Sequence, residues 1–192
     1  MAWKEDPARE AEMRAAHVGE LKPLDRNIRL VEYDPQWPLM FQHEAERIRA
    51  ALGARALRIE HAGSTSVPGL AAKPIIDIIL EVADSSKENS YVPALEAAGY
   101  VLRIREPDWN QHRMFKGPDI ELNLHVYTSG CEEISRMLAF RDWLRVDDAD
   151  RELYERTKRE LAEEKWKYTQ DYADAKTAVV AEILTRAQAK IR

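Results

Sequence analysis

The feature that most constrains the fold of this chain is an apolar run at residues 75–82, IIDIILEV. Every residue in the run except Asp77 and Glu81 is Ile, Leu or Val. A short, continuous run rich in β-branched residues is typical of a strand that other elements cover on both faces. Residues 75–82 therefore predict a central strand, around which the rest of the chain must supply neighbouring strands and covering helices.

Periodicity along the chain predicts those other elements. Alternating apolar and polar residues predict strands at residues 27–33, 57–61, 100–105, 113–116 and 120–127. Apolar residues spaced three to four apart predict helices at 34–53, 85–98, 132–145, after Asp147-Asp148 and through 179–187. In the first of these helices, Asp34 would be the N-cap and Pro35 the first helical residue. Strands in the first two thirds and helices at the ends predict an α+β fold, with a mixed sheet flanked by helices and a C-terminal helical segment.

The length of 192 residues fits one domain. Residues 1–26 are polar and show no clear strand pattern, so we expect a partly ordered N-terminal arm, followed by a single domain at residues 27–192. No apolar run approaches the roughly 18–20 residues that a membrane-spanning helix needs, and the N-terminus lacks the apolar core of a signal peptide. The chain has one cysteine, Cys131, which suits a reducing compartment. We therefore expect a cytoplasmic protein that does not enter a membrane.

The overall charge gives no attraction to polyanions. The chain has 29 basic and 34 acidic residues, for a net charge of −5. No patch for nucleic acid is evident, so any phosphate binding must come from a local group of residues.

A loop rich in glycine and hydroxyl groups, HAGSTSVPGLAAKP, leads into the predicted central strand. Gly63 would let the backbone approach a ligand closely, and the amides and hydroxyls of Ser64, Thr65 and Ser66 could surround an anion. Lys73, directly before the strand, could neutralise a phosphate group. The loop indicates a site for a phosphate-bearing small molecule, although the same residue types also occur in loops that only turn the chain.

Polar residues inside the predicted strands indicate a second part of the site. Asp77 lies within an otherwise apolar strand, where a carboxylate without a partner would be costly. Asn123 and His125 share one face of the strand predicted at 120–127. If the two strands are neighbours, these three side chains form a cluster suited to binding a metal ion or moving a proton. In the alternative, Asp77 only accepts backbone hydrogen bonds or pairs with Lys73 or an arginine, and residues 120–127 form a solvent-facing edge strand.

Basic residues in the C-terminal helices could reach the same site. Arg141 lies on one predicted helix, and Tyr154 and Lys158 lie one turn apart on the next. We expect Arg141 and Lys158 to contact the phosphate, although most such residues lie on solvated helix surfaces. Tyr172 and Lys176 repeat the same spacing and either contribute to the site or pack along their helix.

Several of these segments, in the same order, resemble the GrpB family. They are VEYDPQWPLMF, HAGSTSVPGLAAKPIIDI, LHVY, and FRDWLR followed by the Y-x-x-x-K spacing, within residues 28–180. The resemblance implies a nucleotidyltransferase-like fold, in which a Gly-Ser turn precedes a strand with two metal-binding carboxylates. Gly63-Ser64 would be the turn that contacts a triphosphate and Asp77 the first carboxylate, but the second position is occupied by Ile79.

The resemblance leaves two classes of function. In the first, the chain is an enzyme that transfers a nucleotidyl or phosphoryl group, with Asp77 and His125 as catalytic residues that, with Asn123, bind Mg²⁺ or another divalent cation. In the second, it is a binding module that holds a nucleotide or CoA precursor without a reaction, because the acid at position 79 is absent. Family members fused to dephospho-CoA kinases imply a functional link to CoA biosynthesis.

Overall fold

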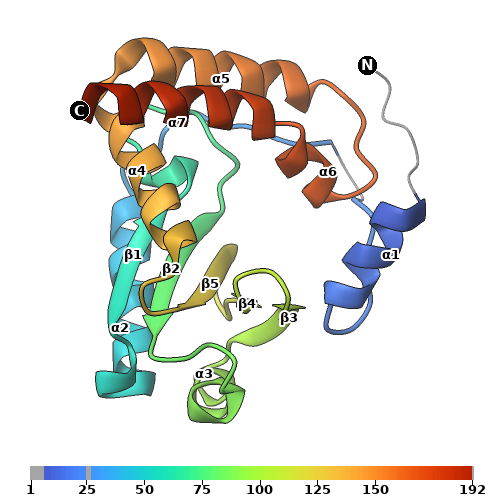
Figure 1. Cartoon of the computed structure of the whole chain (residues 1–192), viewed down its shortest axis with the longest axis vertical. Helices are drawn as coiled ribbons and strands as arrows, with labels where there is room; N and C mark the ends of the chain where they lie inside the picture. Colours follow the sequence, from blue (N-terminus) through green and yellow to red (C-terminus); the bar gives the residue numbers. More distant parts are fainter. Residues whose placement is uncertain (1–6, 25–26, 192) are drawn as a thin grey trace.

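The computed structural model describes residues 7–24 and 27–191. Residues 1–6 and 25–26 of the expected arm, and residue 192 of the expected domain, lie outside these ranges. Within them, the chain forms a five-stranded mixed sheet flanked by helices (Figure 1). This architecture confirms the predicted α+β fold.

The sheet contains the strands predicted between residues 57 and 127. Their bounds are β1 Arg58–Ala62, β2 Ile76–Val82, β3 Val101–Glu106, β4 His112–Lys116 and β5 Leu122–Thr128. The spatial order is β1-β2-β5-β4-β3; β2 and β5 are parallel, and the other neighbouring pairs are antiparallel. Strand β2 therefore has a neighbour on each side, as its apolar sequence predicts, and β5 lies directly beside it.

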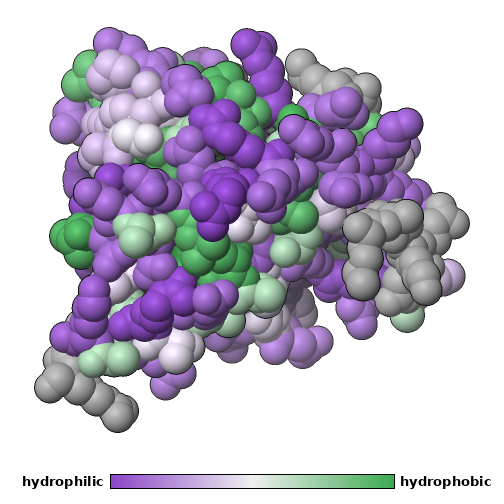
Figure 2. Space-filling view, turned by 90° about the horizontal axis from the view of Figure 1, so that it is seen from above, coloured by the Kyte–Doolittle hydropathy of each residue, from purple (hydrophilic) through white to green (hydrophobic). Residues whose placement is uncertain are grey.

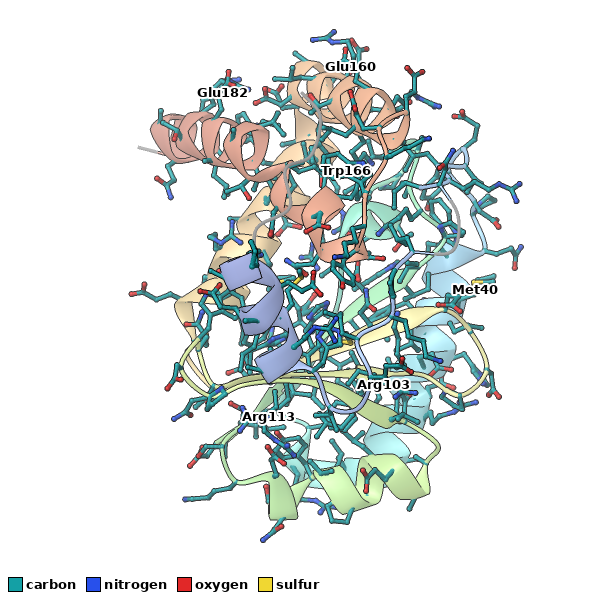
Figure 3. All side chains as sticks on the ribbon, turned by 90° about the vertical axis from the view of Figure 1, so that its right-hand side faces the viewer. Met40, Arg103, Arg113, Glu160, Trp166 and Glu182 are labelled. Atoms are coloured by element: carbon teal, nitrogen blue, oxygen red, sulfur yellow. The ribbon has the colours of Figure 1, made fainter. Side chains whose placement is uncertain are left out.

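The helices surround the sheet at its faces and at one end. Their bounds are α1 Pro7–Ala16, α2 Trp37–Leu52, α3 Val92–Ala97, α4 Glu132–Val146, α5 Asp148–Ala162, α6 Thr169–Asp174 and α7 Thr177–Ile191. In Figure 1, α5 and α7 lie side by side across one end of the sheet, while α1 lies next to β3 at the far edge. The surface over α5 and α7 is mostly hydrophilic (Figure 2). Glu160 of α5 and Glu182 of α7 are exposed on the outside of these helices (Figure 3). None of the helices in residues 7–24 and 27–191 has both the length and the apolar character needed to cross a membrane.

One face of the sheet is apolar and carries the main core. Ile78, Leu80, Leu124 and Phe115 have no exposed surface and pack together with residues of α2 and α3. Helix α2 presents Ile48 to this core, because its apolar residues recur every three to four positions. Each buried side chain of this kind contributes roughly 1.5–3 kcal/mol to folding, so this face stabilises the sheet.

The opposite face of the same strands is mixed. Helix α4 covers one part of it, where Ile79, Ala62 and Tyr127 form a smaller apolar cluster with residues of that helix. Asp77 and Asn123 lie on this face, because successive side chains of a strand point to opposite sides of the sheet. The site predicted from the sequence is therefore on the face that does not carry the main core.

The prediction of a strand at residues 27–33 is wrong. This segment makes a single bridge, in which Val31 and Ala72 exchange backbone hydrogen bonds of 2.9 Å. The ladder does not continue past Ala72, because Pro74 lies two residues further along and has no N–H to donate.

Two predicted helices begin later than expected. Asp34 is not the N-cap of α2: its carboxylate accepts a 2.8 Å hydrogen bond from the amide of Gln36, which closes a turn before the helix begins at Trp37. The helix predicted at residues 85–98 is reduced to a short 3₁₀ turn and α3. Pro93 then falls in the first turn of α3, where its missing N–H costs nothing.

Candidate anion-binding site

Asp77, Asn123 and His125 lie together at the start of the parallel strand pair. Asp77 and Asn123 are register partners, and the Asn123 side-chain amide donates a 2.7 Å hydrogen bond to Asp77 Oδ1. His125 Nε2 lies 3.7 Å from the same oxygen. The predicted adjacency of these residues is therefore confirmed, and Asp77 has the partners that its position in an apolar strand requires.

Gly63 follows β1 and lies directly over Asp77. Its φ is +66°, a conformation that favours glycine, and a Cβ added there would lie 2.2 Å from Asp77 Oδ2 and 3.0 Å from Asp77 Cγ. Only a residue without a side chain allows this approach. The predicted role of Gly63 in bringing the backbone close to the site therefore has a direct geometric basis.

The hydroxyl groups after Gly63 differ in what they can reach. Thr65 Oγ1 donates to the Ile75 carbonyl, and Ser66 Oγ donates to the Gly63 carbonyl. Both side chains are buried, so these bonds hold the turn in shape. Ser64 is only partly buried and lies against the Tyr154 hydroxyl, so its predicted contact with a ligand stays a prediction.

Three ammonium groups gather around Asp77. We call Lys73, Lys116 and Lys176 the lysine cluster. Each is near enough to Asp77 for that carboxylate to raise its pKa, but burial is the larger effect and lowers all three pKa values, that of Lys176 to about 8. Lys73 also lowers the pKa of Lys176, and Lys116 that of Lys73, so the positive charges act on one another.

The three lysines come from separate elements and are held by different contacts. Lys116, on β4, donates a 2.8 Å hydrogen bond to Asn123 Oδ1. The ammonium groups of Lys73 and Lys176 lie 5.1 and 4.2 Å from the centre of the Tyr172 ring. Tyr172 is buried, and within the described part of the chain its hydroxyl has no hydrogen-bond partner. An unpaired buried hydroxyl is costly, and a ligand could satisfy it.

The Asp77 carboxylate is ionised and reachable. Burial would raise the pKa of Asp77, but the contacts with His125 and Asn123 and the charge of Lys73 outweigh this effect and lower the pKa. Although protein atoms surround the carboxylate densely, 27% of the side-chain surface stays accessible. The site thus places the Asp77 carboxylate beside three ammonium groups, one of which, that of Lys116, also lies 3.9 Å from the Glu121 carboxylate, at a place that solvent can enter.

Lys158 lies near this cluster but is almost fully enclosed. Its ammonium group donates a hydrogen bond to the Ala71 carbonyl and lies 4.9 Å from the centre of the Tyr154 ring. Burial first, and then the charge of Lys176, lower the pKa of Lys158 to about 7. With 2% of its surface exposed, Lys158 adds to the local positive charge but has little surface for direct contact with a ligand.

Arg141 is held in a structural network. Its Nη1 donates 2.9 Å hydrogen bonds to Glu60 Oε2 and to the His61 carbonyl, and its Nε donates to Asp142. These bonds tie α4 to β1 and engage the side of the guanidinium that a phosphate would need. The predicted contact between Arg141 and a phosphate stays a prediction, and these protein partners would compete with it.

A hydrogen-bonded row of side chains that sequence reasoning missed ends at His125, next to Asp77. Glu106 Oε2 lies 2.7 Å from His112 Nδ1, and His112 Nε2 lies 3.0 Å from His125 Nδ1. The two imidazole rings are stacked, and His112 is buried. The only signal in the sequence was the alternation of β4, which places His112 on the same face as Lys116.

The residues around Asp77 do not fit a divalent cation held by two carboxylates, which the resemblance implies. Ile79 is fully buried in the cluster under α4. Asn123 uses its amide on Asp77 and its carbonyl on Lys116. Among residues 7–24 and 27–191, no three His, Cys, Asp or Glu side chains are grouped to hold a metal ion. The predicted ligands Asp77, Asn123 and His125 are adjacent, but they form an incomplete donor set beside positive charges.

Comparison with known proteins places this chain in a family. A sequence model of the GrpB protein family matches residues 27–186. The chain belongs to the GrpB family. The resemblance inferred from the separated segments is thus confirmed, and the Gly63-Ser64 turn before β2 is consistent with a nucleotidyltransferase-like fold.

Similar proteins cover nearly all of the chain. The UPF0157 protein BH1888 of Halalkalibacterium halodurans is 58% identical over 183 residues, which are 95% of this chain and 94% of that protein. A crystal structure of the GrpB protein from Enterococcus faecalis has a TM-score of 0.71 at 32% identity, covering 85% of this chain and 99% of that one. A dephospho-CoA kinase of Mycolicibacterium paratuberculosis is 32% identical over 158 residues, 69% of this chain but 39% of the kinase. The region similar to this GrpB-family chain is therefore only a part of that longer protein.

Proposed function

We propose that this GrpB-family protein binds a phosphate-bearing small molecule, such as a nucleotide or a CoA precursor, at the Gly63-Ser64 turn and the lysine cluster. The observation that carries the proposal is the gathering of three ammonium groups near Asp77: Lys116 reaches it through Asn123, and Lys73 and Lys176 share the Tyr172 ring. Bringing like charges together in a partly buried place costs free energy, and an anion bound between them would offset that cost.

Neutral donors around the cluster support a phosphate group as the anion. Among the described residues, the Tyr172 hydroxyl is buried without a hydrogen-bond partner, and Ser64, next to Gly63, is partly exposed. A phosphate has several acceptor oxygens and takes hydrogen bonds from hydroxyl and backbone donors as well as from ammonium groups. The similarity to part of a dephospho-CoA kinase makes CoA and dephospho-CoA natural members of the ligand set.

Calorimetric titration with ATP, ADP, CoA and dephospho-CoA tests the proposal. At least one of them is expected to bind the parent protein, and the double variant Lys73→Met, Lys176→Met is expected to lose that binding. Lys190→Met is a matched control, because Lys190 also lies over an aromatic ring, 4.8 Å from the centre of Trp143, but pairs with Asp147 near the end of α7. Equal binding by parent and double variant, or no binding by any ligand, would contradict the proposal.

A second function, transfer of a nucleotidyl or phosphoryl group, is favoured by the row of side chains from Glu106 to His125. An acceptor hydroxyl must lose its proton during such a transfer, and an imidazole nitrogen beside the bound phosphate is a suitable acceptor. Glu106 and His112 hold the His125 ring in place, with its Nε2 towards Asp77. In this role, the acceptor oxygen would bond to the phosphorus as the P–O bond to the leaving pyrophosphate or nucleoside diphosphate breaks. His125 would take the acceptor's proton, and Lys73 and Lys176 would hold the phosphate.

Mass spectrometry of products separates the enzyme from the binding module. Parent protein incubated with a nucleotide that it binds, and with candidate acceptors, should form a transfer product if the protein is an enzyme. His125→Asn should then bind as tightly as the parent but form little product. Binding without product in the parent protein would favour the module that only holds its ligand.

A further inference from the structure

The charge around Asp77 is opposite in sign to that of a metal clamp. In an enzyme that binds phosphates through divalent cations, clustered carboxylates hold the cations, and the cations hold the phosphate oxygens. Here Asp77 and, 3.9 Å from Lys116, Glu121 face the lysine cluster, and Ile79 is buried where the second metal-binding carboxylate would be. Asp174 also acts on Lys176 but is paired with Arg9. With all three lysines protonated, their charge exceeds that of Asp77 and Glu121, so the site attracts anions and repels divalent cations.

The lysines supply fixed positive charge in the same place. Lys116 is anchored through Asn123 to the side of Asp77, and Lys73 and Lys176 lie over one aromatic ring. A pKa of about 8 leaves Lys176 mostly protonated at neutral pH, and a bound anion would keep it so. These three ammonium groups come from β4, the segment before β2 and the segment before α7, so a ligand held between them would be contacted from several sides.

We infer that the lysine cluster takes the place of the divalent cations and that the site binds the phosphate group directly, without a metal ion. This inference rests on the proposed function and adds the form of the ligand, an anionic phosphate that is not complexed by Mg²⁺. It also reverses the role of Asp77. In a metal clamp Asp77 would be required for binding, whereas here its negative charge opposes the phosphate and balances the lysines while the site is empty.

Titration of ATP and pyrophosphate with and without metal tests the inference. In EDTA, the parent should bind at least as tightly as with Mg²⁺ or Mn²⁺, because the metal-free ligands carry more negative charge. Asp77→Asn should bind about three- to tenfold more tightly than the parent in EDTA, because one repelling charge is removed at short range. Binding that requires Mg²⁺ or Mn²⁺ and is lost in Asp77→Asn would overturn the inference but leave the proposed function standing. Absence of binding in every condition would overturn both.

A second variant keeps the test decisive if Asp77→Asn does not fold. Lys116→Met should weaken binding in EDTA about tenfold, since it removes one of the three positive charges. Glu121→Met, which removes an exposed carboxylate 3.9 Å from Lys116, is the control and should bind as tightly as the parent or more tightly. Equal affinity of Lys116→Met and parent in EDTA would overturn the inference.

Discussion

The two faces of the sheet use the same strands for different purposes. On one face, Leu80, Leu124 and Phe115 are fully buried with residues of α2 and α3. On the other face, Asp77 of β2 and Asn123 of β5 lie side by side, and their side chains are hydrogen-bonded to each other. The pleat of a strand separates these side chains. The protein can therefore place costly charged groups on one face while the other face stabilises the sheet that carries them.

The largest loss of stability is expected from a substitution on the apolar face. Phe115→Ala should lower the free energy of unfolding by about 3–5 kcal/mol, because it leaves a cavity at a fully buried position. Urea denaturation measures this loss. His125→Asn, on the opposite face of the adjacent strand, is the comparison and should cost less than half as much. Equal losses for the two variants would contradict the division of roles between the faces.

The buried charge near the polar face should make stability depend on pH. The pKa of Lys158 is about 7 in the folded protein and close to 10.5 in the unfolded chain. Between these values the unfolded chain binds more protons, so stability rises with pH. Relative to Lys158→Met, the parent should gain about 5 kcal/mol across this window, because the two pKa values differ by roughly 3.5. Chemical denaturation at several pH values measures the difference. Parallel plots of stability against pH for the two proteins would show that folding does not lower the pKa of Lys158.

The close approach of Gly63 to Asp77 should be visible as a difference between two glycines. Gly63→Ala should cost about 2 kcal/mol more than Gly69→Ala, because the new Cβ would collide with Asp77. Gly69 also has a positive φ, +77°, but a Cβ there meets nothing within 4 Å. The strain from φ is thus present in both variants. Thermal unfolding of the pair isolates the collision, and equal stabilities would mean that Asp77 moves aside freely.

The smallest effect on binding is expected from Arg141. Arg141→Lys should change the affinity for a bound nucleotide by less than about twofold, because the guanidinium is engaged by Glu60, Asp142 and the His61 carbonyl. The same variant should lower stability by about 1 kcal/mol, because a lysine cannot replace all of these bonds. Calorimetry and denaturation on the same preparation measure both. A clear loss of affinity with unchanged stability would place Arg141 in the ligand site instead.

The sequence predicted the strands and their polar positions well where the pattern was local. The continuous run at 75–82 and the alternation at 120–127 predicted β2 and β5, and the cost of a lone Asp77 predicted partners such as Asn123 and His125. The pattern failed at residues 27–33, where pairing depends on the segment before β2 and not on local residues. The predicted helix starts at Asp34 and near residue 85 were wrong, because a turn in the first case and a proline in the second shift the first helical residue.

The sequence by itself determined the family, the α+β fold and the carboxylate at the centre of the site, because strand periodicity and a glycine turn leave local marks. Only the tertiary structure decided which basic residues surround that carboxylate. Lys116 and Lys176 lie near Asp77 together with Lys73, whereas Arg141 is hydrogen-bonded to Glu60 of β1. These charges come from elements far apart in the chain, and their meeting depends on strand order and helix packing. Contacts between such distant residues leave no periodic pattern in the sequence, so the total positive charge near Asp77 can be seen only in the folded protein.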